Sequence, residues 1–310
     1  MKLFYRKYGD GPPLIILHGL YGSSDNWVTI AKRLSDSFTV YLPDQRNHGQ
    51  SPHSQLHDYV SMRDDLYELV NDLGLKKFFL AGHSMGGKTA IAFALKWPEI
   101  LNGLLIADIS PFTTIKLKDS VYSQHYTILN AIISLDPGKI SNRSEAEKFL
   151  TQNIPSEKER GLILKNLQRN SDNTFTWKLN ASSLLKNLGK IMEGIEYQTD
   201  FNQQITGFPV IFLRGTDSDY IPKEDFRDIL HVFPAADIID VEGAGHWIQV
   251  DRPDEVVKYL KKLLALSYLT RPLILSSFFA SSPTSRLGEG LGRGGLQKCN
   301  RFYFIFTYSR

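Results

Sequence analysis

Cysteine is nearly absent from this sequence of 310 residues. The single cysteine, Cys299, has no partner for an internal disulfide, and it excludes a metal site built from several thiolates. The sequence also has no His-Glu-x-x-His segment and no histidines clustered at metal-ligand spacing. We therefore expect neither a disulfide framework nor a bound metal.

Long apolar stretches and nucleotide-binding loops are missing as well. No apolar run reaches the roughly 18–20 residues that a membrane-spanning helix needs. Residues 1–7 alternate like a strand and lack the apolar centre of a signal peptide. No Gly-x-Gly-x-x-Gly segment follows a predicted strand, and Gly9-Asp10-Gly11 does not resemble a phosphate-binding loop. These absences predict a cytoplasmic protein with no membrane span and no cofactor.

The positive net charge of +3 does not come from the main part of the chain. Residues 268–310 hold six basic residues and one acidic residue, so this tail carries +5 and residues 1–267 carry −2. The basic residues of the tail are Arg271, Arg286, Arg293, Lys298, Arg301 and Arg310. The charge is therefore no argument for nucleic-acid binding by residues 1–267. The tail is rich in Gly and Ser, and we expect it to be disordered.

Apolar residues make up 42% of the chain, enough for a buried core. Short apolar runs alternate with amphipathic helical patterns. The runs predict strands at 3–8, 14–17, 38–42, 77–81, 104–111, 209–214 and 236–241, and the patterns predict helices at 25–35, 58–73, 89–97, 223–233 and 253–266. This alternation predicts an α/β fold, with a mostly parallel twisted sheet covered by helices on both faces.

The alternation of strands and helices breaks between residues 112 and 203. This region is polar, contains no clear buried strand, and shows helical patterns near 118–134, 144–152, 157–169 and 181–195. We interpret 112–203 as a helical cap inserted into a core made of 1–111 and 204–267, with 268–310 as a separate tail.

One stretch of the predicted core carries chemistry by itself. Residues 80–88 contain Gly82-His83-Ser84-Met85-Gly86, with a strand before it and a helix after it. A serine on so sharp a turn faces outward at the carboxyl end of a sheet, and the glycines relieve the crowding of the turn. Ser84 is therefore the candidate nucleophile.

A serine hydroxyl needs a base within hydrogen-bond reach and a carboxylate that orients the base. His246 is the best candidate for the base, because it follows a loop of small residues (243–245) after the last predicted strand. Three other histidines are weaker candidates. We expect His83 to point away from the site, His48 to hold its own loop in shape, and His18 to be structural or part of the site wall.

The sequence offers candidates for the carboxylate that orients His246 at two different strand ends. Asp108 lies 24 residues after Ser84, at the end of the next predicted strand, and Asp217 and Asp219 follow the strand at 209–214. Both strand ends can reach His246 from the same side, because ligands of such sheets bind beyond the carboxyl ends of the strands.

Acyl transfer also needs donors for the oxyanion of the tetrahedral intermediate. The backbone N–H of the residue after the nucleophile is one usual donor, which is Met85 here. The turn after the first buried strand supplies the second, and Gly19 permits a close approach there, so we expect the N–H of Leu20.

Several stretches together resemble the α/β-hydrolase superfamily over about residues 3–266, and most closely its YbfF-type and abhydrolase-domain-11-like esterases. The matching segments are His18-Gly19-Leu20-Tyr21-Gly22-Ser23, Asp44-x-Arg46-Asn47-His48-Gly49-x-Ser51, Gly82-His83-Ser84-Met85-Gly86-Gly87-Lys88, Asp108-Ile109-Ser110-Pro111, Ser218-Asp219-Tyr220 and Gly243-Ala244-Gly245-His246-Trp247. Many α/β-hydrolases carry the acid where this chain has Ser218. The resemblance instead implies Asp108, since this branch takes the acid from the Asp-Ile-x-Pro segment.

The resemblance implies a serine esterase or thioesterase, without a cofactor, that acts on small-molecule carboxylic esters or acyl thioesters. An acyltransferase to an alcohol, a carbon–carbon hydrolase or a cofactor-free peroxidase on the same triad, and a non-catalytic binding protein are the alternatives. The sequence leaves acyl-chain preference, the alcohol and the oligomeric state open.

Overall fold

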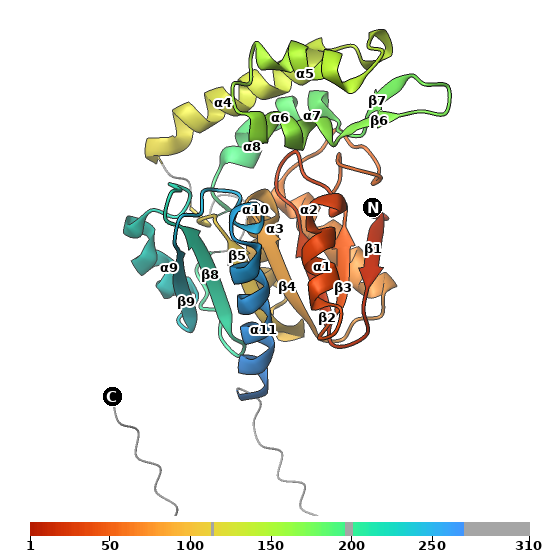
Figure 1. Ribbon diagram of the computed structural model, residues 1–310. Helices are drawn as coiled ribbons and strands as arrows, with labels where there is room; N and C mark the ends of the chain where they lie inside the picture. The colour runs from red at the N-terminus through yellow and green to blue at the C-terminus, as the bar shows by residue number, and fades with distance from the viewer. Residues whose placement is uncertain (113–114, 196–200, 270–310) are drawn as a thin grey trace, which may run out of the picture. The chain divides into compact units, whose positions relative to one another are not determined.

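The computed structural model covers residues 1–310 and describes residues 1–112, 115–195 and 201–269 (Figure 1). The expected disorder of the tail falls on 270–310, which lie outside the described residues. All described residues belong to one compact unit, Met1–Arg271. No helix among them is both long and apolar enough to cross a membrane.

A seven-stranded sheet forms the centre of this unit, with strand order β1-β3-β2-β4-β5-β8-β9. Its strands are β1 (Tyr5–Tyr8), β2 (Pro13–Leu17), β3 (Thr39–Pro43), β4 (Phe78–His83), β5 (Leu101–Ala107), β8 (Val210–Gly215) and β9 (Ala236–Val241). Only β1 is antiparallel to its neighbour, and the other strand pairs are parallel. The predicted fold class is therefore confirmed.

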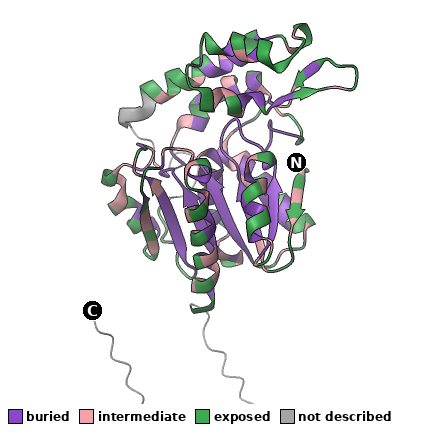
Figure 2. Ribbon diagram, viewed as in Figure 1, coloured by how far each residue is buried: buried purple, intermediate pink, exposed green. Residues whose placement is uncertain are grey.

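Helices cover both faces of the sheet, and β2 shows why. Leu14 and Ile16 belong to one buried cluster with residues of α1 (Val28–Leu34) and α11 (Pro253–Leu269). Ile15 and Leu17 belong to another, with residues of α2 (Tyr59–Asp72) and α3 (Met85–Lys96). Because neighbouring residues of a strand point to opposite faces, a strand between two helical layers must be apolar at every position. Figure 2 shows the strands buried and the outer helical surfaces exposed.

The helices of the core mostly end near the residues that the sequence predicts. They are η1 (Ser24–Trp27), α1 (Val28–Leu34), α2 (Tyr59–Asp72), α3 (Met85–Lys96), η2 (Pro98–Ile100), η5 (Lys223–Asp225), α9 (Phe226–Val232), α10 (Ile248–Asp251) and α11 (Pro253–Leu269). The helix expected at 25–35 begins as the 3-10 turn η1, and α11 extends through Leu269, two residues into the expected tail.

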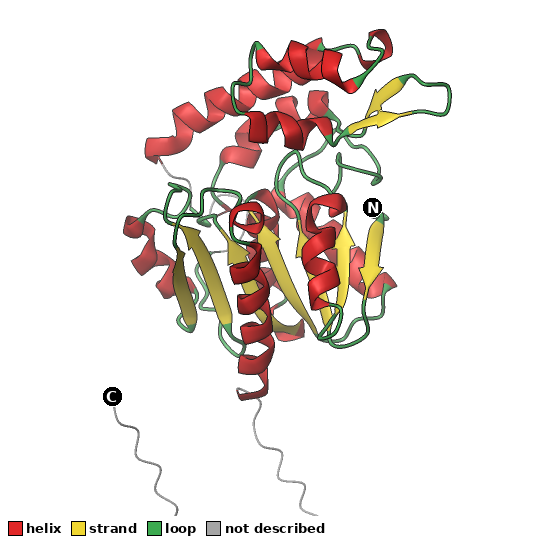
Figure 3. Ribbon diagram, in the orientation of Figure 1, coloured by secondary structure: helices red, strands yellow, loops and turns green. Residues whose placement is uncertain are grey.

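The region expected to be a cap is mainly helical but also contains a small hairpin (Figure 3). Its elements are α4 (Ile115–Ser134), η3 (Pro137–Lys139), α5 (Arg143–Thr151), α6 (Glu157–Leu164), β6 (Leu167–Arg169), β7 (Phe175–Trp177), α7 (Ala181–Lys186) and α8 (Leu188–Met192). In Figure 1 these elements lie beyond the carboxyl ends of the parallel strands, so the cap covers the edge where the candidate residues end.

Two predictions for the cap were wrong in detail. The helix expected at 157–169 ends at Leu164, and residues 167–169 form β6, whose turn to β7 places Asn173 in the left-handed region at φ 68°. The helix expected at 181–195 is two helices separated at Asn187, whose side-chain amide donates to the carbonyl of Gln55 at 2.9 Å. Strands of three residues are too short to show an alternating pattern.

Candidate active site

Ser84 stands on a strained turn between β4 and α3. Its φ is 52°, in the left-handed region that non-glycine residues rarely occupy. A Cβ at Gly82 would lie 2.2 Å from the carbonyl oxygen of Gly86, and a Cβ at Gly86 would lie 2.5 Å from the carbonyl oxygen of His18. Only glycine fits at these two positions, so the local sequence builds the turn that projects Ser84.

The structure brings the three side chains predicted for catalysis together. His246 lies on the loop after β9, and its Nε2 is 2.9 Å from Ser84 Oγ. Its Nδ1 is 2.8 Å from Asp108 Oδ2. The ring of Tyr220 stacks on that of His246, with centroids 3.6 Å apart and planes at 16°. The imidazole is thus held between a hydroxyl and a carboxylate, with a fixed ring plane.

Asp108 is fully buried at the end of β5. Its Oδ1 accepts a hydrogen bond from the N–H of Gly215 at 2.9 Å, and its Oδ2 accepts from both His246 and the hydroxyl of Ser218. These three donors hold the carboxylate in one orientation.

The two alternative acids lie elsewhere. Asp217 and Asp219 are exposed to solvent, and the histidine hydrogen-bonds to neither of them. The residue between them, Ser218, faces inward and donates to Asp108. The resemblance had already drawn attention to Ser218, because many α/β-hydrolases carry their acid at this position.

The other histidines near the site have structural contacts. His83 donates from Nε2 to the carbonyl oxygen of His246 at 2.7 Å, so its ring lies beneath the active-site loop. His18 Nε2 accepts from the N–H of Gln45 at 2.9 Å, and His48 Nδ1 is 2.9 Å from the carbonyl oxygen of Arg46. Burial lowers the pKa of all three histidines, which keeps them neutral near pH 7.

The two backbone amides predicted to bind the oxyanion, those of Leu20 and Met85, belong to residues that lie close to Ser84. Leu20 and Met85 line the same pocket as Ser84, and no described residue accepts a hydrogen bond from either N–H. Met85 is the first residue of α3, where intrahelical acceptors are missing. A Cβ at Gly19 would approach Ser84 Cβ to 3.2 Å, so glycine lets this turn come close to the nucleophile. These amides are available to a charged oxygen.

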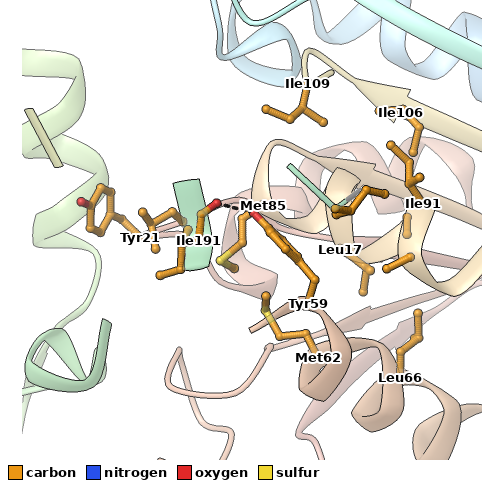
Figure 4. Close-up of a cluster of buried hydrophobic side chains, with 14 of the residues drawn as sticks. Leu17, Tyr21, Tyr59, Met62, Leu66, Met85, Ile91, Ile106, Ile109 and Ile191 are labelled. Carbon is orange, nitrogen blue, oxygen red and sulfur yellow. Dashed lines mark hydrogen bonds between the residues drawn. The ribbon is translucent and has the colours of Figure 1, made fainter. Parts of the chain in front are cut away.

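The pocket on the Met85 side of Ser84 is mostly apolar, although Lys88 and His125 also line it. It has an empty volume of about 620 Å³, counting its open mouth, within the range of small-molecule sites. Its wall includes Tyr59, Ile109 and Ile191. Figure 4 shows Tyr59 beside Met85, with its hydroxyl donating to the carbonyl oxygen of Ile191 at 2.7 Å, which ties the cap to the core. We call this cavity the apolar pocket.

A second cavity also borders Ser84 and shares Leu20, His125 and Tyr220 with the apolar pocket. Its empty volume is about 700 Å³, and it is lined by His246, Trp247 and residues of the cap, including Glu159 of α6. We call it the outer chamber. Among the described residues, no group of three or more His, Cys, Asp or Glu side chains is arranged to hold a metal ion.

The fold and this site together define the class of protein. Residues 12–253 match the family model described as alpha/beta hydrolase fold, so the chain belongs to the α/β-hydrolase family. The resemblance of the sequence to the α/β-hydrolase superfamily is therefore confirmed.

Several similar proteins are named as esterases or lipases. The sn-1-specific diacylglycerol lipase ABHD11 of Danio rerio is 36% identical over 79% of this chain and 76% of its own length. Esterase YbfF of Escherichia coli is 28% identical over 82% of this chain and 94% of its own length. A solved structure of a marine microorganism esterase is 41% identical, with a TM-score of 0.80, and the match covers 84% of this chain and 99% of that one.

Proposed function

We propose that this protein is a serine esterase and thioesterase that cleaves small acyl substrates through an acyl-enzyme. The Oγ of Ser84 attacks the carbonyl carbon while Nε2 of His246 takes its proton. The tetrahedral intermediate collapses, the bond from carbon to the leaving oxygen or sulfur breaks, and His246 returns the proton to that atom. Water then attacks the acyl-enzyme in the same way and releases the carboxylic acid.

The remaining groups would stabilise the charges that develop during the reaction. The N–H groups of Leu20 and Met85 would stabilise the oxyanion, since both lie beside Ser84 with no acceptor of their own in the described chain. Asp108 would orient the imidazole and stabilise its protonated form, and Ser218 would hold the carboxylate in place. The cycle routes no step through a metal or an organic cofactor.

One observation carries this proposal. The hydrogen-bonded chain runs from Ser84 Oγ to His246 at 2.9 Å and on to Asp108 at 2.8 Å, and two cavities open on the same serine. A binding protein would have no need of a base aligned on a strained serine, whereas acyl transfer needs both at this distance.

Replacement of Ser84 tests the proposal directly. Ser84→Ala should lower the kcat for p-nitrophenyl acetate by about 10⁴-fold or more and abolish labelling by a fluorophosphonate probe. Ser144→Ala, at an exposed serine of α5, is the matched control and should leave both readouts unchanged. A folded wild-type protein that neither hydrolyses the ester nor takes the label is a binding protein rather than an enzyme.

Product analysis separates the hydrolase from an acyltransferase. With ethanol added at rising concentration, a hydrolase should release mainly the free acid, whereas an acyltransferase should release mainly the ethyl ester. Acyl esters and thioesters of graded chain length would then define how much of the apolar pocket the acyl group fills. The single cysteine is consistent with work in a reducing compartment, and we propose the cytoplasm.

A further inference from the structure

The two cavities differ in which catalytic group they reach. Both touch Ser84, but of the two only the outer chamber is lined by His246. His246 must protonate the departing atom. The leaving group therefore has to lie in the cavity that is lined by His246, where it can reach Nε2. The apolar pocket is then left for the acyl chain. The outer chamber is thus the place where the alcohol or thiol part of the substrate sits.

One carboxylate faces the outer chamber. Glu159 lies in the first turn of α6, is about half-buried, and accepts a hydrogen bond from the side-chain amide of Gln124 at 2.7 Å. Among the described residues no lysine or arginine forms an ion pair with it. Burial raises the pKa of this carboxyl, while the electrostatic influence of His246 opposes the rise. The carboxylate is therefore partly desolvated, and no basic side chain in the described part of the chain pairs with it.

Apart from His246, the titratable groups near Glu159 add no positive charge that would cancel this carboxylate. His125 also lines the outer chamber, and burial lowers its pKa to about 4, so it is neutral near pH 7. Lys158 precedes Glu159 in the chain, but its Nζ pairs with Asp251 at 2.5 Å. The electrostatic potential at the chamber wall beside Glu159 is therefore negative.

Three aromatic side chains also line the chamber, beside the aliphatic Leu162 and Ile163. Tyr21, Tyr220 and Trp247 all line the outer chamber together with Glu159. Aromatic faces attract cations through the electron density of their rings, and the effect is strongest for ammonium groups that are partly removed from water. Aromatic rings combined with one carboxylate make a wall suited to a quaternary ammonium group.

We propose that the outer chamber binds the leaving group of the substrate and that Glu159 makes it selective for a cationic alcohol or thiol of the choline type over an anionic one. This inference rests on the proposed esterase and thioesterase activity. It adds a specificity-determining residue from the cap, where the sequence alone indicated no site residue.

Three thioesters that share the same acyl group isolate the effect of charge in the leaving group. Acetylthiocholine carries an ammonium, 3,3-dimethylbutyl thioacetate is its neutral carbon isostere, and 3-(acetylthio)propanoate carries a carboxylate. Glu159→Gln keeps the size of the side chain and a hydrogen bond to Gln124 but removes the charge. In this variant the kcat/KM for the cation should fall about tenfold, that for the anion should rise about tenfold, and that for the neutral isostere should stay unchanged.

A neighbouring glutamate provides the matched control. Glu157 also lies in the first turn of α6 but is exposed and does not line the chamber. Glu157→Gln makes the same change in net charge and should leave all three values unchanged. An equal loss of cation preference in both variants, or no change in Glu159→Gln, would overturn the role of Glu159.

Inhibition of the wild-type enzyme needs no variant. Tetramethylammonium should compete with 3,3-dimethylbutyl thioacetate, whereas sodium at equal ionic strength should not. Absence of this competition, or a wild-type enzyme that prefers the anionic thioester, refutes the chamber as an ammonium site even if p-nitrophenyl acetate is cleaved. Unchanged thioester cleavage by Ser84→Ala instead removes the proposed function, and the leaving-group site with it.

Discussion

Replacement of Asp108 by asparagine tests the role of the buried carboxylate most sharply. The carboxylate accepts hydrogen bonds from Gly215, Ser218 and His246, and every one of these partners is a donor. An amide has one acceptor oxygen and one donor nitrogen. In Asp108→Asn, therefore, a donor must face another donor on one side, or His246 must adopt the tautomer that leaves Nε2 protonated and unable to act as a base.

The magnitude of the loss follows from these contacts. The wrong tautomer in a triad of this geometry lowers kcat by about 10⁴-fold. Leaving one buried partner without an acceptor costs about 1–3 kcal/mol of stability, because Asp108 is fully buried. We expect both effects in Asp108→Asn, measured as p-nitrophenyl acetate hydrolysis and as the free energy of unfolding in urea.

Asp217→Asn and Asp219→Asn are the matched controls, since both carboxylates are exposed and neither receives a hydrogen bond from His246. Each should keep hydrolysis within about twofold of the wild type and leave stability within about 0.5 kcal/mol. If Asp219→Asn lost activity while Asp108→Asn kept it, the acid would lie on the strand end after β8, and the reasoning from the hydrogen bonds would be refuted.

Two further predictions concern residues next to this chain of hydrogen bonds. Ser218→Ala removes one donor to Asp108 but leaves Gly215 and His246 in place, so kcat should fall about tenfold with little change in KM, and a fall as large as that of Asp108→Asn would contradict a supporting role. Burial depresses the pKa of His125 to about 4, below the unfolded value of 6.5, so the unfolded state binds more protons and stability falls as pH drops from 6.5 towards 4. Between pH 7 and pH 5 the wild type should lose about 1–2 kcal/mol more than His125→Gln in urea unfolding, and equal losses would show that His125 does not titrate in this way.

The structure places Ser84 and His246 at the strand ends where the sequence locates them, because short-range constraints specify these positions. A serine between Gly82 and Gly86, with a strand before and a helix after, allows few other structures, and the close contacts of these glycines show the reason. His246 could be identified from the sequence for a similar reason, because the small residues before it follow a strand that ends at the edge where Ser84 lies.

The cap was the least predictable part. The hairpin of β6 and β7 has strands of three residues, which carry no alternation, and the break at Asn187 depends on a contact with Gln55 far away in the chain. Glu159 shows the same difficulty at the site. In the sequence it is one of several glutamates in a helical pattern, and nothing local distinguishes it from Glu157, which faces solvent.

The sequence by itself determined the fold class and the position of the sharp turn, because apolar alternation and glycine contacts act over a few residues. It could not decide between Asp108 and Asp219 from spacing alone, since β5 and β8 are neighbours in the sheet and both end beside His246. The tertiary structure decided which side chains meet. It buries Asp108 among three donors, turns Ser218 inward, and carries Glu159 from a distant segment to the chamber beside Ser84.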